Sequence, residues 1–242
     1  MFWREKRSLS AAPMYGKIAI TLILLISGLG YLLGFANIYL TYSPTDEKPG
    51  LSIADVRIAF YGARDKTVLE ASIDGSMREY FPSDADYQAT KDWIASGAKE
   101  EGFQRIKPIF EESCDVCHSA DMAVGGVVLV SYQDAQVYLQ QDTGKSVNRL
   151  VSLSHTHLLA TLSAIFILVF IFSFVRYADW AKGLVMVLSL LAIVVDIGSW
   201  WLAKFFAWAA PLVILGGVYL ALSFAVLIVL SLVDMWFLPE EC

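Results

Sequence analysis

The stretch Cys114-Asp115-Val116-Cys117-His118 decides how the polar middle of this chain can fold. Its spacing, Cys-x-x-Cys-His, is that of a c-type haem attachment site. Two thiols three residues apart can each bond one vinyl group of the same porphyrin, and the imidazole of the next residue can bind the iron. We therefore predict one covalently attached haem c, held by Cys114 and Cys117, with His118 as the proximal iron ligand.

Two other chemistries use similar motifs. A thioredoxin-like dithiol favours a βαβ context, which the surrounding sequence lacks. A zinc site needs two further Cys or His ligands. The whole sequence has three Cys and three His, so Cys242, His155 and His157 are the remaining candidates. This scarcity favours the haem interpretation.

The residues around the motif carry a family resemblance. Residues 106–113 read IKPIFEES and residues 119–129 read SADMAVGGVVL. The order Pro-Ile-Phe, motif, Gly-Gly-x-x-Leu resembles the planctomycete type of cytochrome c domain. The resemblance covers about 103–132, and it implies a small helical domain that carries one haem.

An apolar stripe precedes the motif, formed by Phe103, Ile106, Ile109 and Phe110. At three- and four-residue spacing these side chains share one face of a helix. We expect this face to pack against the haem edge or to form ordinary core. Gly125-Gly126 allows a close backbone turn past the ring.

A six-coordinate haem needs a second axial ligand. Our first candidate for this distal ligand is His155 or His157, and Met77 is the next. Met122 lies only four residues beyond His118, which is too short a loop to reach the opposite face of the ring. A haem b is expected only with a partner subunit, because the other apolar segments contain no histidine.

His155 and His157 are two residues apart on a predicted helix and therefore point in different directions. They can be interfacial imidazoles bonded to Ser152, Ser154 or lipid headgroups. Alternatively, one of them caps the haem c, or serves as a haem b ligand or as a proton acceptor from quinol. The sequence leaves these alternatives open.

The chain has 242 residues, of which 57% are hydrophobic, and its net charge is −6. The mean hydropathy of +0.56 is too high for an ordinary soluble domain. Four apolar segments are long enough to cross a bilayer. They span residues 18–42, 151–175, 184–202 and 210–233.

These segments divide the chain into three parts. Residues 1–42 form a cytoplasmic N-terminus and the first transmembrane helix, which we expect to be retained as an anchor instead of being cleaved as a signal peptide. Residues 43–150 form a polar domain with helical periodicity. Residues 151–242 form three transmembrane helices and a short tail. The predicted fold is an all-α membrane protein with a helical, periplasmic cytochrome c domain inserted between helices one and two.

Basic residues orient the chain in the membrane. Arg4, Lys6, Arg7 and Lys17 precede or begin the first segment, and Arg176 and Lys182 lie between the second and third. The positive-inside rule places these flanks in the cytoplasm. Both termini are then cytoplasmic and the polar domain is periplasmic, where haem c is attached. We expect a multi-pass protein of the bacterial inner membrane.

Asp196 lies within the third apolar segment. An intramembrane carboxylate is costly and marks a candidate functional site. Because Asp196 and His157 lie at similar depths, we expect the carboxylate to pair with one of the two histidines. The alternative is a neutral carboxyl group bonded to Ser199 or another hydroxyl.

The function predicted from these residues is single-electron transfer at the periplasmic face, within a larger respiratory or photosynthetic membrane complex. The expected partners are other subunits, a redox partner and membrane lipid, and the negative net charge argues against nucleic acid. No catalytic residues are predicted, so we expect an electron-transfer subunit and not an independent enzyme. The alternatives are a quinol-oxidising subunit and a haem-based sensor or assembly factor.

Overall fold

The computed structural model describes residues 8–43, 45, 46 and 48–238. Contacts divide the chain into two compact units. One, the transmembrane unit, is drawn from residues 1–41 and 146–242, and the other, the central unit, is Tyr42–Lys145. Apart from one isolated β-bridge between Thr67 and Gln141, the regular structure of the described residues is helical.

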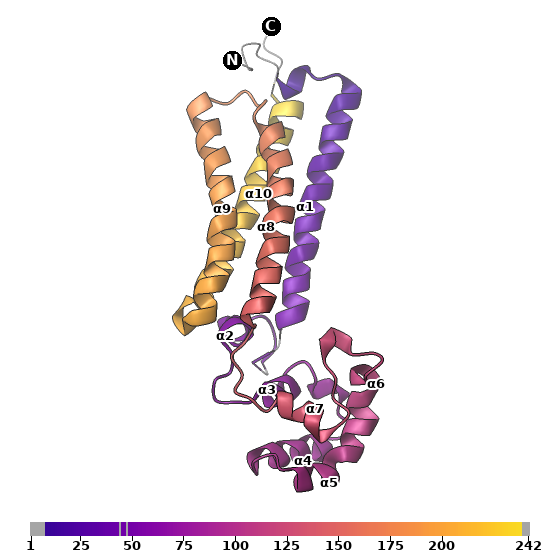
Figure 1. Ribbon diagram of the computed structural model, residues 1–242. Coiled ribbons are helices and arrows are strands. Elements are labelled where there is room, and N and C mark those ends of the chain that lie inside the picture. The colour runs from indigo at the N-terminus through magenta and orange to yellow at the C-terminus, as the bar shows by residue number, and fades with distance from the viewer. Residues whose placement is uncertain (1–7, 44, 47, 239–242) are drawn as a thin grey trace. The chain divides into compact units, whose positions relative to one another are not determined.

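Four long helices form the transmembrane unit (Figure 1): α1 (Met14–Tyr42), α8 (Val147–Phe172), α9 (Asp179–Phe205) and α10 (Ala210–Trp236). Each has 26–29 residues. At 1.5 Å per residue this is about 40 Å, more than the apolar core of a bilayer. The prediction of an all-helical protein with four membrane-spanning segments is confirmed.

The helices extend beyond the apolar segments that predicted them. α8 begins at Val147, where the hydroxyl of Ser146 accepts a hydrogen bond from the Arg149 backbone N–H. Hydropathy reports only the part of a helix that faces lipid, whereas backbone hydrogen bonding continues into the polar headgroup region. The boundary between the two units therefore precedes Ser146, a few residues before the predicted one.

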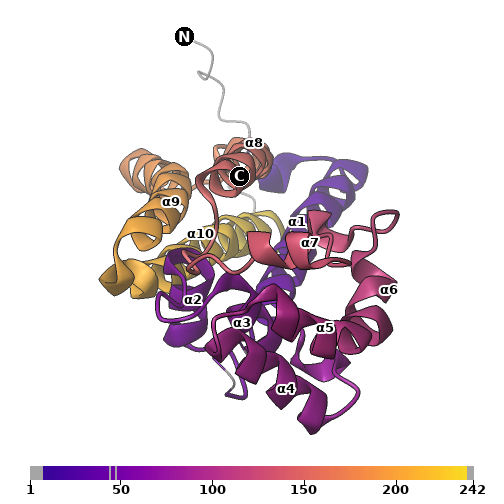
Figure 2. The same ribbon diagram turned by 60° about the horizontal axis from the view of Figure 1, so that its bottom comes forward.

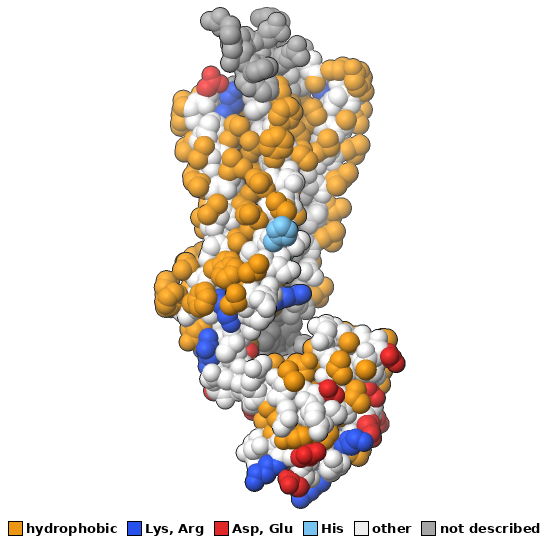
Figure 3. Space-filling model, viewed as in Figure 1, with side chains coloured by type: hydrophobic (Ala, Val, Ile, Leu, Met, Phe, Trp, Pro, Cys, Tyr) orange, Lys and Arg blue, Asp and Glu red, His pale blue; other side chains and the backbone are white. Residues whose placement is uncertain are grey.

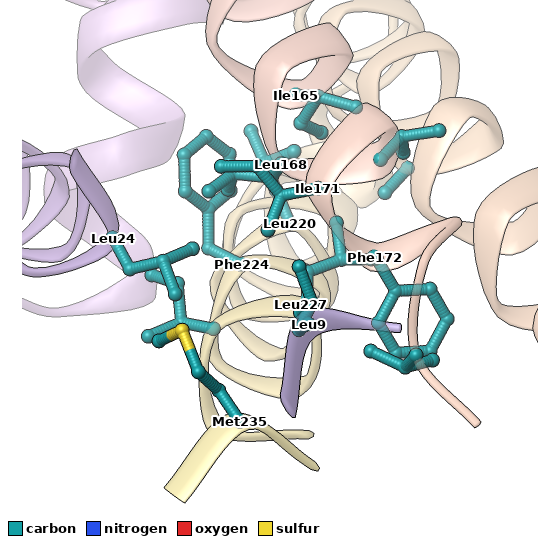
Figure 4. Close-up of a cluster of buried hydrophobic side chains, with 14 of the residues drawn as sticks. Leu9, Leu24, Ile165, Leu168, Ile171, Phe172, Leu220, Phe224, Leu227 and Met235 are labelled. Carbon is teal, nitrogen blue, oxygen red and sulfur yellow. The ribbon is translucent and has the colours of Figure 1, made fainter. Parts of the chain in front are cut away.

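Large apolar side chains from every helix of the transmembrane unit form its core (Figure 4). Leu24 from α1, Phe172 from α8 and Leu227 from α10 are almost completely buried. Many other apolar side chains are exposed on the outer surface, where Figure 3 shows them covering the bundle. Close packing holds such helices together, because burial from lipid adds little driving force.

A buried ion pair closes one end of this bundle. Asp234 near the end of α10 has no exposed surface, and its Oδ1 accepts hydrogen bonds from the Arg176 backbone N–H (3.0 Å) and Nε (3.1 Å). Leu9 donates a backbone hydrogen bond to Phe174 at the same end. The loop between α8 and α9 is thereby tied both to α10 and to the segment before α1.

Short helices form the central unit, in the order α2 (Ile53–Tyr61), α3 (Val68–Asp74), η2 (Arg78–Tyr80), α4 (Asp84–Ala95), α5 (Glu100–Ile109), η3 (Phe110–Cys114), α6 (Asp115–His118), η4 (Val124–Gly126) and α7 (Tyr132–Val137). Side-chain hydroxyls cap the first turns of four of them: Ser52, Thr67, Ser83 and Ser131. The helix α3 ends at Asp74 and is followed by Gly75, whose flexible backbone terminates it.

Two glycines bring the ends of the central unit together. Gly62 has φ +96° and Gly144 has φ +68°. A Cβ at Gly62 would lie 2.5 Å from the carbonyl oxygen of Asp142, and one at Gly144 would lie 2.5 Å from that of Phe60. Only glycine allows these two backbone segments, about 80 residues apart in the sequence, to lie in direct contact, because a Cβ on either one would clash with the other.

An aromatic cluster forms the core of the central unit. The ring centroid of Phe103 lies 5.5 Å from that of Trp93, 5.2 Å from Phe110 and 5.8 Å from Tyr132. These rings come from α4, α5, η3 and α7, so the cluster holds four elements around the segment that leads into the Cys-x-x-Cys-His motif.

Candidate cofactor site and an intramembrane polar cluster

The motif lies where a helix changes its hydrogen-bonding pattern. Phe110–Cys114 forms a π-helical turn, and Asp115–His118 continues as a short α-helix. Residues three and four apart share one face of such a segment, so Cys114, Cys117 and His118 point to the same side. All three line one cavity of the central unit.

The cavity has a volume of about 300 Å³. Two of the helices labelled in Figure 2, α3 and α6, contribute lining residues. Its walls are mainly aliphatic and aromatic, as in sites for flat apolar ligands. The residues that line it are Val68, Leu69, Ser72, Ile73, Ser76, Met77, Tyr80, Phe81, Phe110, Ser113, Cys114, Cys117, His118, Val124, Val127, Leu129 and Tyr138.

A hydrogen bond sets the tautomer of His118. Its Nδ1 lies 3.2 Å from the carbonyl oxygen of Val127. A carbonyl can only accept, so Nδ1 carries the proton and donates it. In the neutral imidazole, Nε2 then carries the lone pair that can bind a metal, which is the arrangement that ligating histidines in proteins generally show.

The two cysteines differ in exposure, Cys114 being half-buried and Cys117 exposed. Burial, with a smaller contribution from Asp115, raises the pKa of the Cys114 thiol to about 11. A redox-active dithiol requires the opposite shift. The environment therefore suits a cysteine held in a thioether better than a reactive thiolate.

Ser113 adds a further indication that the cavity accommodates a ligand. Its hydroxyl oxygen is buried without a hydrogen-bond partner, and the residue lines the same cavity. Buried hydroxyls nearly always find a partner, so an unpartnered one at a cavity wall fits a site that receives a polar ligand group. A haem, which combines an apolar ring with polar edge groups, fits the residues present.

The candidate distal ligands are divided between the two units. Met77 lines the same cavity as the motif. Its backbone N–H donates a hydrogen bond of 3.0 Å to the carbonyl oxygen of Ser72. Met122 is 62% exposed and lies outside the cavity lining. His155 and His157 belong to the transmembrane unit, where both are exposed on α8.

The apolar stripe that precedes the motif has two roles. Phe103 and Ile106 are buried in the core of the central unit, whereas Phe110 is buried and also lines the cavity. Gly125 and Gly126 both have positive φ values, +68° and +76°, in the turn that follows the motif. This turn leads to Val127, whose carbonyl orients His118.

The sequence alone did not indicate that α3 lines the same cavity as the motif. Val68, Leu69 and Ser72 come from α3, more than forty residues before the motif. The spacing of Leu69, Ile73 and Met77 indicates an apolar helix face but not what that face covers. Among the described residues, no cluster of three or more His, Cys, Asp or Glu suits a metal ion without a haem.

Asp196 is the centre of a second polar group, in the transmembrane unit. It is 8% exposed, and Trp200, one helical turn further along α9, hydrogen-bonds to its carboxylate. His157 lies close enough to interact with it electrostatically. The rings of His157 and Trp200 pack edge to face with centroids 5.0 Å apart.

The comparisons with known proteins cover the transmembrane part of the chain. Residues 136–242 match the model of the family Aq_1264_TM, a transmembrane helical domain. No curated protein and no solved structure matches the chain. The family match includes α8, α9 and α10, and with the four apolar helices it identifies a multi-pass membrane protein with a transmembrane domain similar to Aq_1264_TM.

Proposed function

We propose that this protein is a membrane-anchored monohaem cytochrome c. Cys114 and Cys117 hold the haem covalently, and His118 is the proximal ligand. The observation that carries the proposal is that all three side chains line one apolar cavity, with the Nε2 of His118 left free by its hydrogen bond to Val127. When bound, haem supplies a one-electron couple, so the protein would carry single electrons.

We further propose Met77 as the distal ligand, ahead of His155 and His157. Met77 lines the cavity that contains the motif, whereas the two histidines lie in the other unit. A thioether ligand raises the potential of a haem, and the apolar walls around it exclude water and act in the same direction.

The setting of this electron transfer is also a proposal. The distribution of basic residues supports a central unit outside the cytoplasm, with both termini inside. Four membrane-spanning helices exceed what an anchor needs, which supports a place within a larger membrane complex. The planctomycete-type resemblance of residues 103–132 supports haem attachment.

A redox-titrated absorption spectrum of the purified full-length protein, with its pyridine haemochrome, tests the proposal. We expect one haem c per chain and the charge-transfer band of a methionine-ligated ferric haem. Met77→Leu should remove this band and lower the potential by on the order of 0.1 V or more, since axial ligands dominate haem potentials.

Met122→Leu is the matched control, because Met122 is exposed and outside the cavity lining. It should leave both the band and the potential unchanged. Absence of covalent haem would overturn the proposed function. A six-coordinate spectrum without the methionine band would return the distal position to a histidine, and a five-coordinate haem that binds carbon monoxide would favour a sensor.

A further inference from the structure

The four helices of the transmembrane unit bring polar side chains together inside the membrane. Asp196 lies nine residues before the end of α9, and His157 lies ten residues after the start of α8. At 1.5 Å per residue, both are about 14 Å from the same end of the bundle. Polar groups at this depth are rare and usually functional.

Tyr31 and α10 complete the surroundings of the carboxylate. The Tyr31 hydroxyl, from α1, donates a hydrogen bond of 2.8 Å to the carbonyl oxygen of Gly217. A Cβ at Gly217 would lie 3.9 Å from Oδ1 of Asp196. We refer to Tyr31, His157, Asp196 and Trp200 as the intramembrane polar cluster; together with Gly217 it draws on all four helices.

The intramembrane polar cluster has a side that a ligand in the bilayer can reach. His157 is exposed on α8. The Nδ1 of His157 lies 3.1 Å from the carbonyl oxygen of Leu153 and must donate to it. In the neutral imidazole, Nε2 then carries the lone pair and can accept a hydrogen bond. The ring packs against Trp200, and the residue lies near the Asp196 carboxylate.

The chemistry of the cluster restricts the ligand. An acceptor nitrogen and a carboxylate suit a ligand that donates hydrogen bonds, and they disfavour a lipid phosphate, which the carboxylate would repel. The indole of Trp200 offers an aromatic surface for a flat ring. A haem b is a poor fit, because the two histidines of this unit lie two residues apart on one helix and diverge.

We propose that the intramembrane polar cluster binds the headgroup of a lipid-soluble hydroquinone, in preference to the oxidised quinone, which offers no hydrogen-bond donor. One hydroxyl of the hydroquinone would donate to Nε2 of His157 or to Asp196, and the ring would pack against Trp200. The use of this ligand as an electron source rests on the proposed haem function, whereas its binding does not.

The test is equilibrium binding of radiolabelled decylubiquinone, in its reduced and oxidised forms, to the full-length protein in phosphatidylcholine nanodiscs. We expect saturable binding at one site per chain, tighter for the reduced form. His157→Ala and Asp196→Asn should each weaken binding by about tenfold or more, as expected for loss of a hydrogen bond with a charged or strongly accepting partner.

His155→Ala is the matched control. His155 is exposed on the same helix but points away from the side that His157 occupies. Binding should be unchanged in this variant. Because His157 is exposed, the His157→Ala variant should fold as the wild type does, so its result stands even if Asp196→Asn is unstable.

Absence of saturable binding, or equal weakening by His155→Ala and His157→Ala, would overturn this proposal. The haem content of the same samples separates it from the proposed function. Haem without quinone binding would refute only the quinone site, and quinone binding without haem would refute only the cytochrome function.

Discussion

At the scale of single residues, hydrogen bonds decide which atoms are available for chemistry. The carbonyls of Val127 and Leu153 each accept from the Nδ1 of a histidine, His118 in the central unit and His157 in the transmembrane unit. In the neutral form of each imidazole, the lone pair is then on Nε2. In the first case we propose an iron ligand, and in the second an acceptor for a hydroquinone hydroxyl.

Asp74 carries a buried, ion-paired charge in the central unit. It is 5% exposed, and it accepts hydrogen bonds from the Tyr87 hydroxyl (2.7 Å) and from Lys66 (2.5 Å), and pairs with Lys91 (2.9 Å). Burial raises the pKa of Asp74, but the hydrogen bonds from Lys66, Tyr87 and Lys91 outweigh it, so the pKa lies below its ordinary value of 3.8.

A lowered pKa in the folded state means that the charged carboxylate stabilises the fold above the unfolded pKa. This stabilisation is lost as the pH falls below 3.8 and through the lower folded value. Asp74→Asn should reduce the stability of the protein by roughly 1–3 kcal/mol near neutral pH, because it leaves buried donors without a charged acceptor.

Thermal unfolding of full-length protein in nanodiscs, followed by circular dichroism across acidic pH, measures this effect. The difference between wild type and Asp74→Asn should shrink as the pH drops. Asp84→Asn is the control, since Asp84 pairs with Arg78 in an exposed position and should matter little. A pH-independent difference would show that the charge of Asp74 is not the cause.

At the scale of helices, α9 and α10 of the transmembrane unit pack closely together at Gly216. A Cβ at Gly216 would lie only 2.9 Å from the Cα of Asp196 and 3.3 Å from the Ser199 hydroxyl. The two helix backbones can approach this closely only because position 216 has no side chain, which is the usual role of small residues between membrane helices. The same approach sets the position of the Asp196 carboxylate.

Gly216→Ala should therefore separate α9 from α10 and destabilise the protein by about 1–3 kcal/mol, the usual cost of overpacking. Gly183→Ala in α9 is the control, because nothing lies within 4 Å of a Cβ at that position. It should be neutral or slightly stabilising, since alanine favours helix. Equal unfolding temperatures for the two variants would contradict the close-contact argument.

At the scale of the whole molecule, the chain combines an apolar helical bundle with a polar unit rich in short helices. The proposed haem function requires the polar unit to lie outside the cytoplasm. Alkaline phosphatase fused after Lys145 should then be active, and phosphatase fused after Ala178, in the loop between α8 and α9, should be inactive.

Green fluorescent protein fused at the same two positions serves as the control and should show the opposite pattern, with fluorescence only after Ala178. Active phosphatase at Ala178 together with inactive phosphatase at Lys145 would reverse the orientation. That result would place the Cys-x-x-Cys-His motif in the cytoplasm and argue against covalent haem attachment.

Local patterns in the sequence determined much of this protein. Apolar runs of about 20 residues identify the four transmembrane helices, because crossing a bilayer demands length and hydropathy that few other elements share. Five adjacent residues form the Cys-x-x-Cys-His motif that predicts a haem, because Cys114, Cys117 and His118 need only one helical turn to face the same side. Helix ends were less predictable, since capping and glycine positions such as Gly75 set them.

Only the tertiary structure decided which distant residues meet. Met77 lies 37 residues before Cys114, and nothing in its own neighbourhood indicates that it lines the motif's cavity. Likewise, the sequence indicated a histidine near Asp196 only from the similar depths of the two residues in the membrane. The rotation of the helices and the contact at Gly216 determine that His157 and Trp200 are the neighbours of the carboxylate. Periodicity gives the face of a helix, but the packing of all helices at once decides what that face meets.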